Sequence, residues 1–311
     1  MSDYINQNGL AYSVIEEVTF GTTPTTGERH DLPVDAGQAP LTSAIAQIED
    51  NTQRPNLETA APTNGHASSS GSLSMRFRQC EAIDLLIQSA IAGRFDETTG
   101  LAFGGEEDVF FSLITKLTDK AGPSNNQFLG YADAGLMATK FGITASAKEG
   151  VNCSFDLIGT KRTRLEADHA LPVTAAGGRG FNYIDVKNIT VGGQTLQYTN
   201  LEFSTGVPRD HRVVFGSATP TSIANTGNRA TTLTLKGFRK DFTTDALING
   251  TPLEVKFSIV DGNNHGYRFT LPAAVCTSPT DELGDTGLLI NLEFTAHWDE
   301  TAQAGLVVEK L

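Results

Sequence analysis

The chain has 311 residues, of which 39% are hydrophobic, and its formal net charge is −13. This length allows one large domain or two of ordinary size. It contains no run of eighteen apolar residues, and its first ten residues have no basic segment followed by an apolar one. We therefore expect neither a transmembrane helix nor a signal peptide, and no membrane binding.

The cysteine count and the basic residues narrow the class further. The cysteines Cys80, Cys153 and Cys276 are far apart and form no CxxC motif, which predicts reduced thiols, with the last two in the core. The densest basic run, Lys161–Arg164, is short. A protein that binds DNA through its phosphates needs clustered Lys and Arg, so the composition argues against DNA binding of this kind. An acidic protein can still act next to DNA if it must not bind it.

The first half of the chain predicts strands with one helix among them. An opening strand in YSVIEEVTF is followed by a strand in SAIAQIED and by a long polar loop at 49–71. Residues 72–78 alternate, with Leu73, Met75 and Phe77 on one face. After the helix come the apolar strand VFFSLITKL, from residue 109, and the alternating strand VNCSFDLIG, at 151–159.

The helix after residue 80 is well marked. An apolar stripe at helical spacing is formed by Ile83, Leu86, Ile87 and the following Ala90 and Ile91. Acidic residues lie near its N-terminus, where the helix dipole favours them, and Gly93 is placed to end it. We expect the stripe to pack against a sheet.

A charged, Ala- and Gly-rich hinge is expected at 161–180, and the second half then shows a pattern of predicted elements similar to that of the first. A hairpin in VGGQTL and a strand in TNLEFSTG precede a second long loop, 205–230. The alternating TTLTL leads to a short second helix with Leu247 and Ile248, which Gly250 stops. Two strands, LEVKFSIV and GYRFTLP, are joined by the turn formers Asp261–Asn264, and LLINLEF forms the last strand.

The two halves share one order of features: strand, long loop, strand, helix, strand and final strand. Residues 72–90 align with 231–251, so that Leu73 and Met75 correspond to Leu233 and Leu235. A duplication explains this shared order better than chance. The sequence therefore predicts a mainly β protein with two tandem sandwich or barrel units, each with one flanking helix. We expect the first unit at 1–165, a linker at 166–180 and the second unit at 181–311.

At this point the sequence resembles the tail tube (major tail) proteins of long-tailed phages or prophages of the non-contractile, siphovirus type. The resemblance runs from YSVIEEVTFGTTPTTG through the strand–helix pair at 73–93, FDLIG at 155–159 and VGGQTL at 191–196. It continues to NGTPLEVKFSIVDGNNHGYRFTLP at 249–272. None of these is a short chemical motif, so the specificity comes from their number and order.

The resemblance implies that copies of the chain form rings, that inner strands join into one barrel, and that the rings stack into a hollow tube. The long loops would reach the next ring, and their charged residues are the candidate stacking contacts: Glu49, Asp50, Arg54, Glu58, Arg209, Asp210 and Arg212. Viral DNA would pass through the lumen without specific binding, and an acidic wall would suit this because it repels phosphate.

The duplication bears on stoichiometry, because a chain with two tube units could build from three copies the ring that one-unit subunits build from six. We expect this trimer with pseudo-sixfold symmetry, with a ring of six full chains as the alternative. The resemblance further implies a tape measure protein, a tail terminator and distal tail proteins as partners. It implies synthesis and assembly in the bacterial cytoplasm and a place in the virion.

Nothing in the sequence favours an enzyme or a cofactor. The six histidines show no HExxH or paired metal spacing, and no GxSxG elbow or P-loop occurs. AGGRGF at 176–181 lacks the third glycine of a dinucleotide fingerprint. Two other functions stay open: an inner tube or terminator of another tail-like machine, and a two-domain β-sandwich binding module, which would need an aromatic platform.

Overall fold

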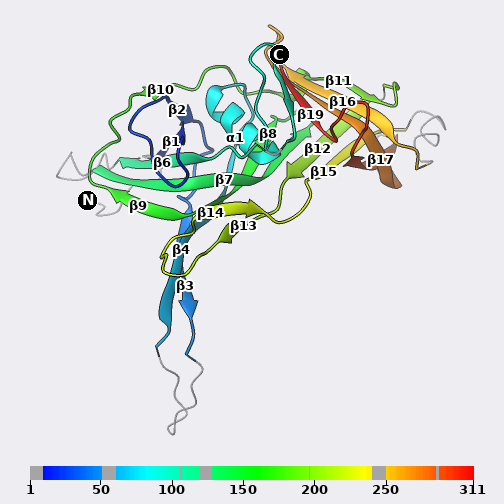
Figure 1. The fold of residues 1–311 in the computed structure, drawn as a ribbon. Helices are drawn as coiled ribbons and strands as arrows, with labels where there is room; N and C mark the ends of the chain where they lie inside the picture. The colour runs from blue at the N-terminus through cyan, green and yellow to red at the C-terminus, as the bar shows by residue number, and fades with distance from the viewer. Residues whose placement is uncertain are drawn as a thin grey trace.

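The computed structural model describes residues 10–50, 61–105, 107–118, 128–195, 197–239, 250–284 and 287–311. Within these residues the chain forms nineteen strands, one α-helix and one short 3-10 helix, so the predicted mainly β class is confirmed (Figure 1). Seventeen of the strands belong to one hydrogen-bonded network, and the remaining two form a separate ribbon.

The first half of the chain contains nine strands. They are β1 (Leu10–Glu16), β2 (Arg29–Leu32), β3 (Thr42–Ile48), β4 (Thr63–Arg76), β5 (Leu101–Phe103), β6 (Phe111–Thr118), β7 (Phe128–Ser146), β8 (Asn152–Gly159) and β9 (Lys161–Leu165). Six of them pair antiparallel in the order β1-β6-β7-β8-β4-β3.

The second half repeats this order. Its elements are β10 (Val173–Thr174), η2 (Tyr183–Asp185), β11 (Val186–Val191), β12 (Tyr198–Gly206), β13 (Arg209–Arg212), β14 (Ser222–Asn225), β15 (Ala230–Phe238), β16 (Leu253–Val260), β17 (Gly266–Gly284), β18 (Gly287–His297) and β19 (Val307–Lys310). Six of them pair antiparallel in the order β11-β16-β17-β18-β15-β12. Strand for strand, this is the topology of the first half.

The correspondence between the halves extends to register. The β7–β8 pair has a bulge between Ala138 and Lys140, and the β17–β18 pair has one between Cys276 and Ser278, each 138 positions further along the chain. In the equivalent central strands, Phe155 faces Leu73 and Leu292 faces Leu235. The structural counterpart of Leu73 is therefore Leu235, two residues beyond the predicted Leu233. A shift of two leaves every side chain on its predicted face, which is why alternation alone did not reveal it.

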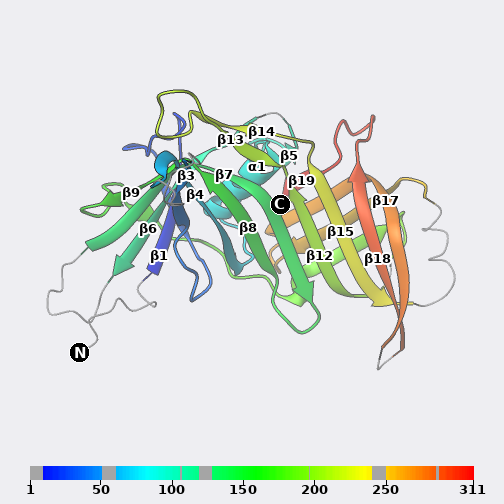
Figure 2. The same cartoon turned by 90° about the horizontal axis from the view of Figure 1, so that it is seen from below.

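The halves join through one strand pair, β7 with β12. As a result, eight strands form a continuous sheet in the order β3-β4-β8-β7-β12-β15-β18-β17. Figure 2 shows the strands from β8 to β17 side by side. Each half contributes four strands in equivalent positions.

The long strands β7 and β17 each take part in two groups of strands. Residues 128–136 of β7 pair with β6 and β9, whereas residues 137–146 pair with β8 and β12. In β17 the early residues pair with β16 and β19 and the later ones with β18. These strands connect the continuous sheet to the layer above it, where β1, β6 and β16 lie (Figure 1).

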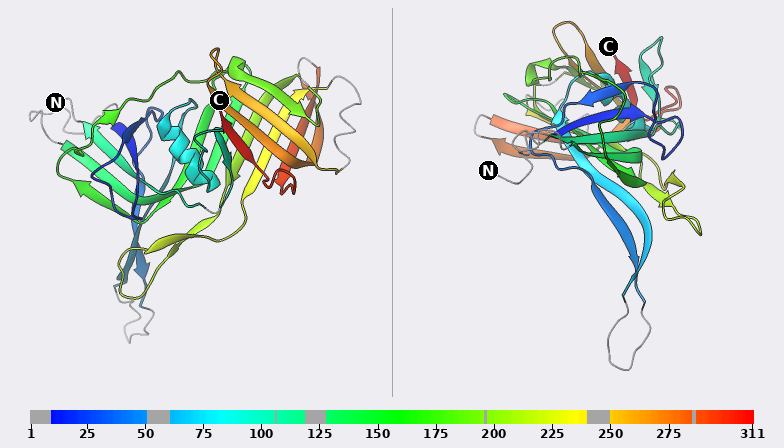
Figure 3. Two further views of the ribbon diagram at one scale, coloured as in Figure 1. Left: turned by 45° about the horizontal axis from the view of Figure 1, so that its top comes forward. Right: turned by 90° about the vertical axis from the view of Figure 1, so that its left-hand side faces the viewer.

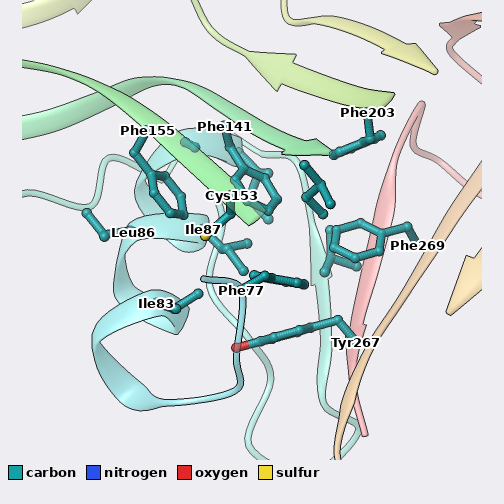
Figure 4. Close-up of a cluster of buried hydrophobic side chains, with 14 of the residues drawn as sticks. Phe77, Ile83, Leu86, Ile87, Phe141, Cys153, Phe155, Phe203, Tyr267 and Phe269 are labelled. Atoms are coloured by element: carbon teal, nitrogen blue, oxygen red, sulfur yellow. The ribbon is translucent and has the colours of Figure 1, made fainter. Parts of the chain in front are cut away.

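A large hydrophobic core lies between these layers and extends through both halves, and a small separate cluster contains Ile15, Ile114 and Ala132. A row of aromatic rings crosses it: Phe155 stacks on Phe141 at 4.9 Å between ring centroids, Phe203 lies 5.2 Å from Phe269, and Phe269 stacks on Phe257 at 4.8 Å. Figure 4 shows most of this row beside the helix. The buried thiols Cys153 and Cys276 lie in the same core, as predicted.

The predicted helix is α1 (Glu81–Ile91), and it covers the core as expected (Figures 3 and 4). Ile83, Leu86 and Ile87 are completely buried. The left-handed residue that ends the helix is Ala92, at φ 53°, rather than Gly93. Gly93 is needed for another reason, because a Cβ there would lie 2.0 Å from the carbonyl oxygen of Phe103.

Three segments that the sequence presents as loops contain strands. Residues 161–165, expected in the hinge, form β9, which pairs with β7. Residues 63–71, expected in the first long loop, belong to β4, and the second loop contains β13 and β14. These strands are polar and lack an alternating apolar face, so only their long-range pairing reveals them. Leu247 and Ile248, predicted to form the second helix, lie outside the described residues.

Candidate functional site

The face of the eight-stranded sheet that points away from the core is lined with small polar side chains. Register places in one row across the strands Ser74, Ser154, Gly142, Ser204, Thr232 and Thr295. The next row contains Arg76, Asn152, Thr144, Glu202, Thr234 and Glu293. The residues between these rows point to the opposite side and form the core, for example Ile143, Phe203 and Leu233. The sheet is therefore apolar on one side and hydroxyl- and amide-rich on the other.

The charges on this polar face are few and weakly acidic in balance. The basic members are Arg76, Lys140 and Lys236, and the acidic ones are Asp156, Glu202, Glu282 and Glu293. Lys236 and Glu282 form an ion pair at 2.5 Å. Since phosphate binding needs clustered unpaired cations, this face should bind a nucleic acid backbone only weakly.

Each end of the sheet is an open edge within the described residues. β3 pairs with β4 on one side, and no other described strand pairs with its second side. Residues 277–284 of β17 likewise pair with β18 alone. An open edge presents unpaired N–H and C=O groups and favours pairing with another chain. The two edges lie at opposite ends of one sheet, so copies of the chain could join head to tail.

A long hairpin, β3–β4, projects from the body of the molecule (Figures 1 and 3). We call it the first arm. Its two strands pair from Thr42 and Ser70 at the base to Ile48 and Thr63 towards the tip. The exposed Ile45 and the half-buried Ala46 are among its few apolar residues.

The ribbon of β13 and β14 forms a second, shorter arm beside the first. The amide of Ala67 donates to the carbonyl of Ala218 at 2.9 Å, and the rings of His66 and His211 lie edge to face. By the repeated topology, the second arm occupies in its half the place of the first. Its loop exposes Val213, Val214 and Phe215, and the Phe215 ring is fully exposed.

The predicted stacking residues fall into three groups. Glu49 and Asp50 are exposed on the first arm, and Asp210 and Arg212 are exposed on the second. Arg209 is buried instead: its Nη1 donates to the carbonyl of Ala138 and its Nε to Asn225 Oδ1, which fixes the second arm on β7. Arg54 and Glu58 lie outside the described residues.

Buried polar contacts hold the layers in place. The Glu17 carboxylate accepts hydrogen bonds from Ser112 Oγ and from the amides of Gly135 and Gly21. Burial raises the pKa of Glu17, and these hydrogen bonds oppose the shift. The carboxylate thereby ties the chain after β1 to β6 and to the middle of β7.

A second buried contact fixes β9. The Arg162 guanidinium donates Nε and Nη2 to the two oxygens of Asp133, at 3.0 and 2.9 Å. Asp133 is completely buried, and burial raises its pKa while Arg162 lowers it. A fork of this kind is strong and directional, so it positions β9 on β7.

Sequence reasoning missed the sheet edges, the second arm and both buried carboxylates. Edges and arms depend on which strands pair, and pairing is a long-range property that periodicity does not contain. The isolated acids Glu17 and Asp133 in strand-like segments were the one local signal, since an acid in an apolar segment is buried only with partners.

Two further observations concern chemistry and membranes. The described residues contain no group of three or more His, Cys, Asp or Glu side chains placed to hold a metal ion. In the same part of the chain, no helix is long and apolar enough to span a bilayer.

Comparison with known proteins gives one finding. A family model described as phage tail tube protein matches residues 7–296, which is nearly the whole chain. No curated protein matches the chain.

Proposed function

The chain belongs to the phage tail tube protein family, and we propose that its copies assemble into stacked rings that form the hollow tail tube for DNA delivery. The observation that carries this proposal is the eight-stranded sheet. It has an apolar inner side, a polar open side and a free edge at each end. Joining such sheets edge to edge gives a closed barrel and removes the edges.

Three copies per ring fit this sheet best. With strands about 4.8 Å apart and tilted by about 40°, roughly 24 strands close into a barrel about 50 Å across between backbones. Six copies would give roughly 48 strands and a barrel about 100 Å across by the same geometry. The smaller barrel suits a channel for one DNA duplex. We therefore propose a trimeric ring with pseudo-sixfold symmetry, in which 1–165 and 181–311 act as two tube units.

The polar face would line the channel. Its Ser, Thr and Asn side chains form weak, exchangeable contacts with water, and its four acidic side chains outnumber its three basic ones. DNA would slide past such a wall because no cluster of cations holds its phosphates. The face contrasts with the whole chain, since most of the −13 charge lies elsewhere.

The two arms would reach the neighbouring ring in the stack. Both project on the same side of the sheet, and the second arm presents an apolar loop at Phe215. Exposed apolar side chains on a projecting loop favour burial in a partner. Glu49, Asp50, Asp210 and Arg212 would add polar contacts at the rim of this interface.

The proposal also places the protein in a virion. We infer a non-contractile tail of the siphovirus type, assembled in the bacterial cytoplasm. A tape measure protein would lie inside the tube, with a tail terminator at one end and distal tail proteins at the other.

Assembly is tested directly by sedimentation and negative-stain microscopy of the purified chain over a range of salt and protein concentrations. We expect hollow, regularly striated tubes, and the same protein in purified virions. A chain that remains monomeric under every condition and is absent from virions would overturn the proposal.

A further inference from the structure

We propose that one strand pair closes the ring: β17 of one copy with residues 41–43 of the next, in the register of the β7–β12 pair. This inference rests on the proposed function, because it concerns the contact between neighbouring copies. It follows from the repeated topology, in which the junction between the two halves already exists once inside each chain.

The internal junction is fully defined. β12 runs antiparallel to the second half of β7, with Phe203 opposite Ile143, Ser204 opposite Gly142 and Thr205 opposite Phe141. The ladder continues beyond the strands, where the amide of Ala147 donates to the carbonyl of Thr199 at 2.8 Å. In the order of the sheet, β7 is the last of the four strands from the first half, and β12 is the first of the four from the second half.

The counterpart of β7 has an open edge where β7 meets β12. β7 and β17 share their bulge, and position for position Phe141 corresponds to Pro279 and Gly142 to Thr280. Within the described residues no strand pairs with this side of β17. The edge therefore lacks the partner that its equivalent has.

The counterpart of β12 is the segment that enters β3. Thr42 faces Ser70 on β4, and Ser204 faces Thr232 on β15. These two positions are equivalent and lie 162 residues apart. The preceding residue agrees: Leu41 is 2% exposed and contacts Gly71, just as the buried Phe203 faces Leu233. Residues 41–43 thus have the place of 203–205, and no described strand pairs with their outer side.

Transferring the internal register predicts the contacts between copies. Leu41 would lie opposite Asp281 of the next copy, Thr42 opposite Thr280 and Ser43 opposite Pro279. Each copy offers one edge of each kind, so the contact can repeat head to tail, and it gives a ring when the rotation between copies closes. The internal β7–β12 pair and this external pair would alternate around the barrel.

The edge of β17 is prepared for such pairing. Ion pairs that reach across β18 partner its acidic side chains: Asp281 pairs with Arg239, just after β15, at 2.6 Å, and Glu282 pairs with Lys236 of β15. Its acidic side chains Asp281 and Glu282 are therefore paired with cations of the same copy. Pro279 has no N–H, so the external junction has one donor fewer than the internal one, and pairing in other registers is disfavoured.

Disulfide cross-linking tests the register. In the internal junction the N–H of Ala147 points to β12, so by alternation Gly142 and Ser204 form a non-hydrogen-bonded pair, whose Cα atoms lie about 4.5 Å apart. This separation suits a disulfide. The variant Thr42→Cys/Thr280→Cys, assembled and then oxidised, should give covalent dimers and trimers on a denaturing gel, and no larger species.

Control variants make the result specific. Each single substitution should give no ladder, and Thr42→Cys/Glu282→Cys, two residues out of register, should link at least tenfold less. A second measurement does not depend on disulfide formation. The thiol introduced by Thr280→Cys alone should react with a thiol reagent at least tenfold more slowly in tubes than in the unassembled chain.

The outcomes separate this inference from the proposed function. Tubes in which the double variant does not link, and in which the thiol introduced by Thr280→Cys stays fully reactive, would overturn the junction and leave the tube assignment intact. A ladder that extends to six would support the register and overturn the three-copy closure. A wild-type chain that never assembles would overturn both proposals.

Discussion

At the scale of single residues, the fold depends on acids that are buried with their partners. Glu17 is 4% exposed and connects three segments through Ser112, Gly135 and Gly21. The hydrogen bonds favour its charged form, but burial outweighs them and raises its pKa. Its contribution to stability therefore depends on pH.

The sign of this dependence follows from the raised pKa. A carboxyl that binds its proton more tightly in the folded chain contributes most below the unfolded pKa, about 4.3, and loses that contribution as pH rises through the folded pKa. In urea unfolding of the unassembled chain, Glu17→Gln should therefore reduce the fall in unfolding free energy between pH 4 and 7.

The same variant should be less stable by about 1–3 kcal/mol at pH 7, because the amide NH2 would face backbone donors. An exposed acid, Glu28→Gln, is the matched control and should change neither quantity. A parallel pH curve for wild type and Glu17→Gln would contradict this account of Glu17.

The Asp133–Arg162 pair gives a second prediction at this scale. Removing only the cation in Arg162→Met leaves a buried charge, so the unfolding free energy should fall by about 3–5 kcal/mol. Arg162→Met/Asp133→Leu should be more stable than the single variant, because no charge remains unpaired. Thermal or urea unfolding measures both, and equal stabilities of the two variants would show that the pair is not coupled.

At the scale of elements, the helix and the strands with one apolar face could be predicted from the sequence. α1 contains the whole predicted stripe, because a stripe such as Ile83, Leu86 and Ile87 has no other regular interpretation, and it ends at Ile91, two residues before the expected stop at Gly93. The turn at Asp261–Asn264 was also predicted from local residue types, and Asn264 adopts a left-handed conformation there, at φ 62°.

The arms could not be predicted in this way. β4 begins at Thr63 with nine residues, TNGHASSSG, that contain no large apolar side chain, and β13 reads RDHR. Such segments bury little on either face, and what makes them strands is a partner far along the chain. β9 is a further case, because its five residues follow β8 directly and are held by Asp133.

Shortening the first arm tests its role in stacking. Replacing residues 47–64 with Asn-Gly closes the hairpin next to the Ile45–Ala67 pair. The described residues in this segment, 47–50 and 61–64, are all exposed, so the unassembled chain should unfold within a few degrees of wild type. Negative staining should show single rings instead of long tubes, and long tubes formed by this variant would contradict the assignment.

A point variant tests the second arm. Phe215→Ser removes an apolar side chain that only a neighbour could bury, and it should raise the protein concentration needed for tube formation about tenfold. Val18→Ser is the matched control, since Val18 is 92% exposed and lies far from both arms in sequence. Equal effects of the two substitutions would show that Phe215 has no special contact.

At the scale of the whole molecule, the repeat explains most of the architecture. Two sets of six strands share one order, and the shared bulges show that the correspondence reaches single residues. The sequence revealed the repeat through its order of features. The two-residue error in its alignment arose because a strand looks the same after a shift of two. The pairing of β7 with β12, which joins the two halves, could not be predicted from local sequence patterns.

The rotational order of one ring tests the central claim most directly. In end-on cryo-electron microscopy of assembled tubes, we expect three copies per ring, six similar lobes and a wall of roughly 24 strands around one channel. A ring of six full chains, or a wall in which the eight-stranded sheets are not joined edge to edge, would contradict the account.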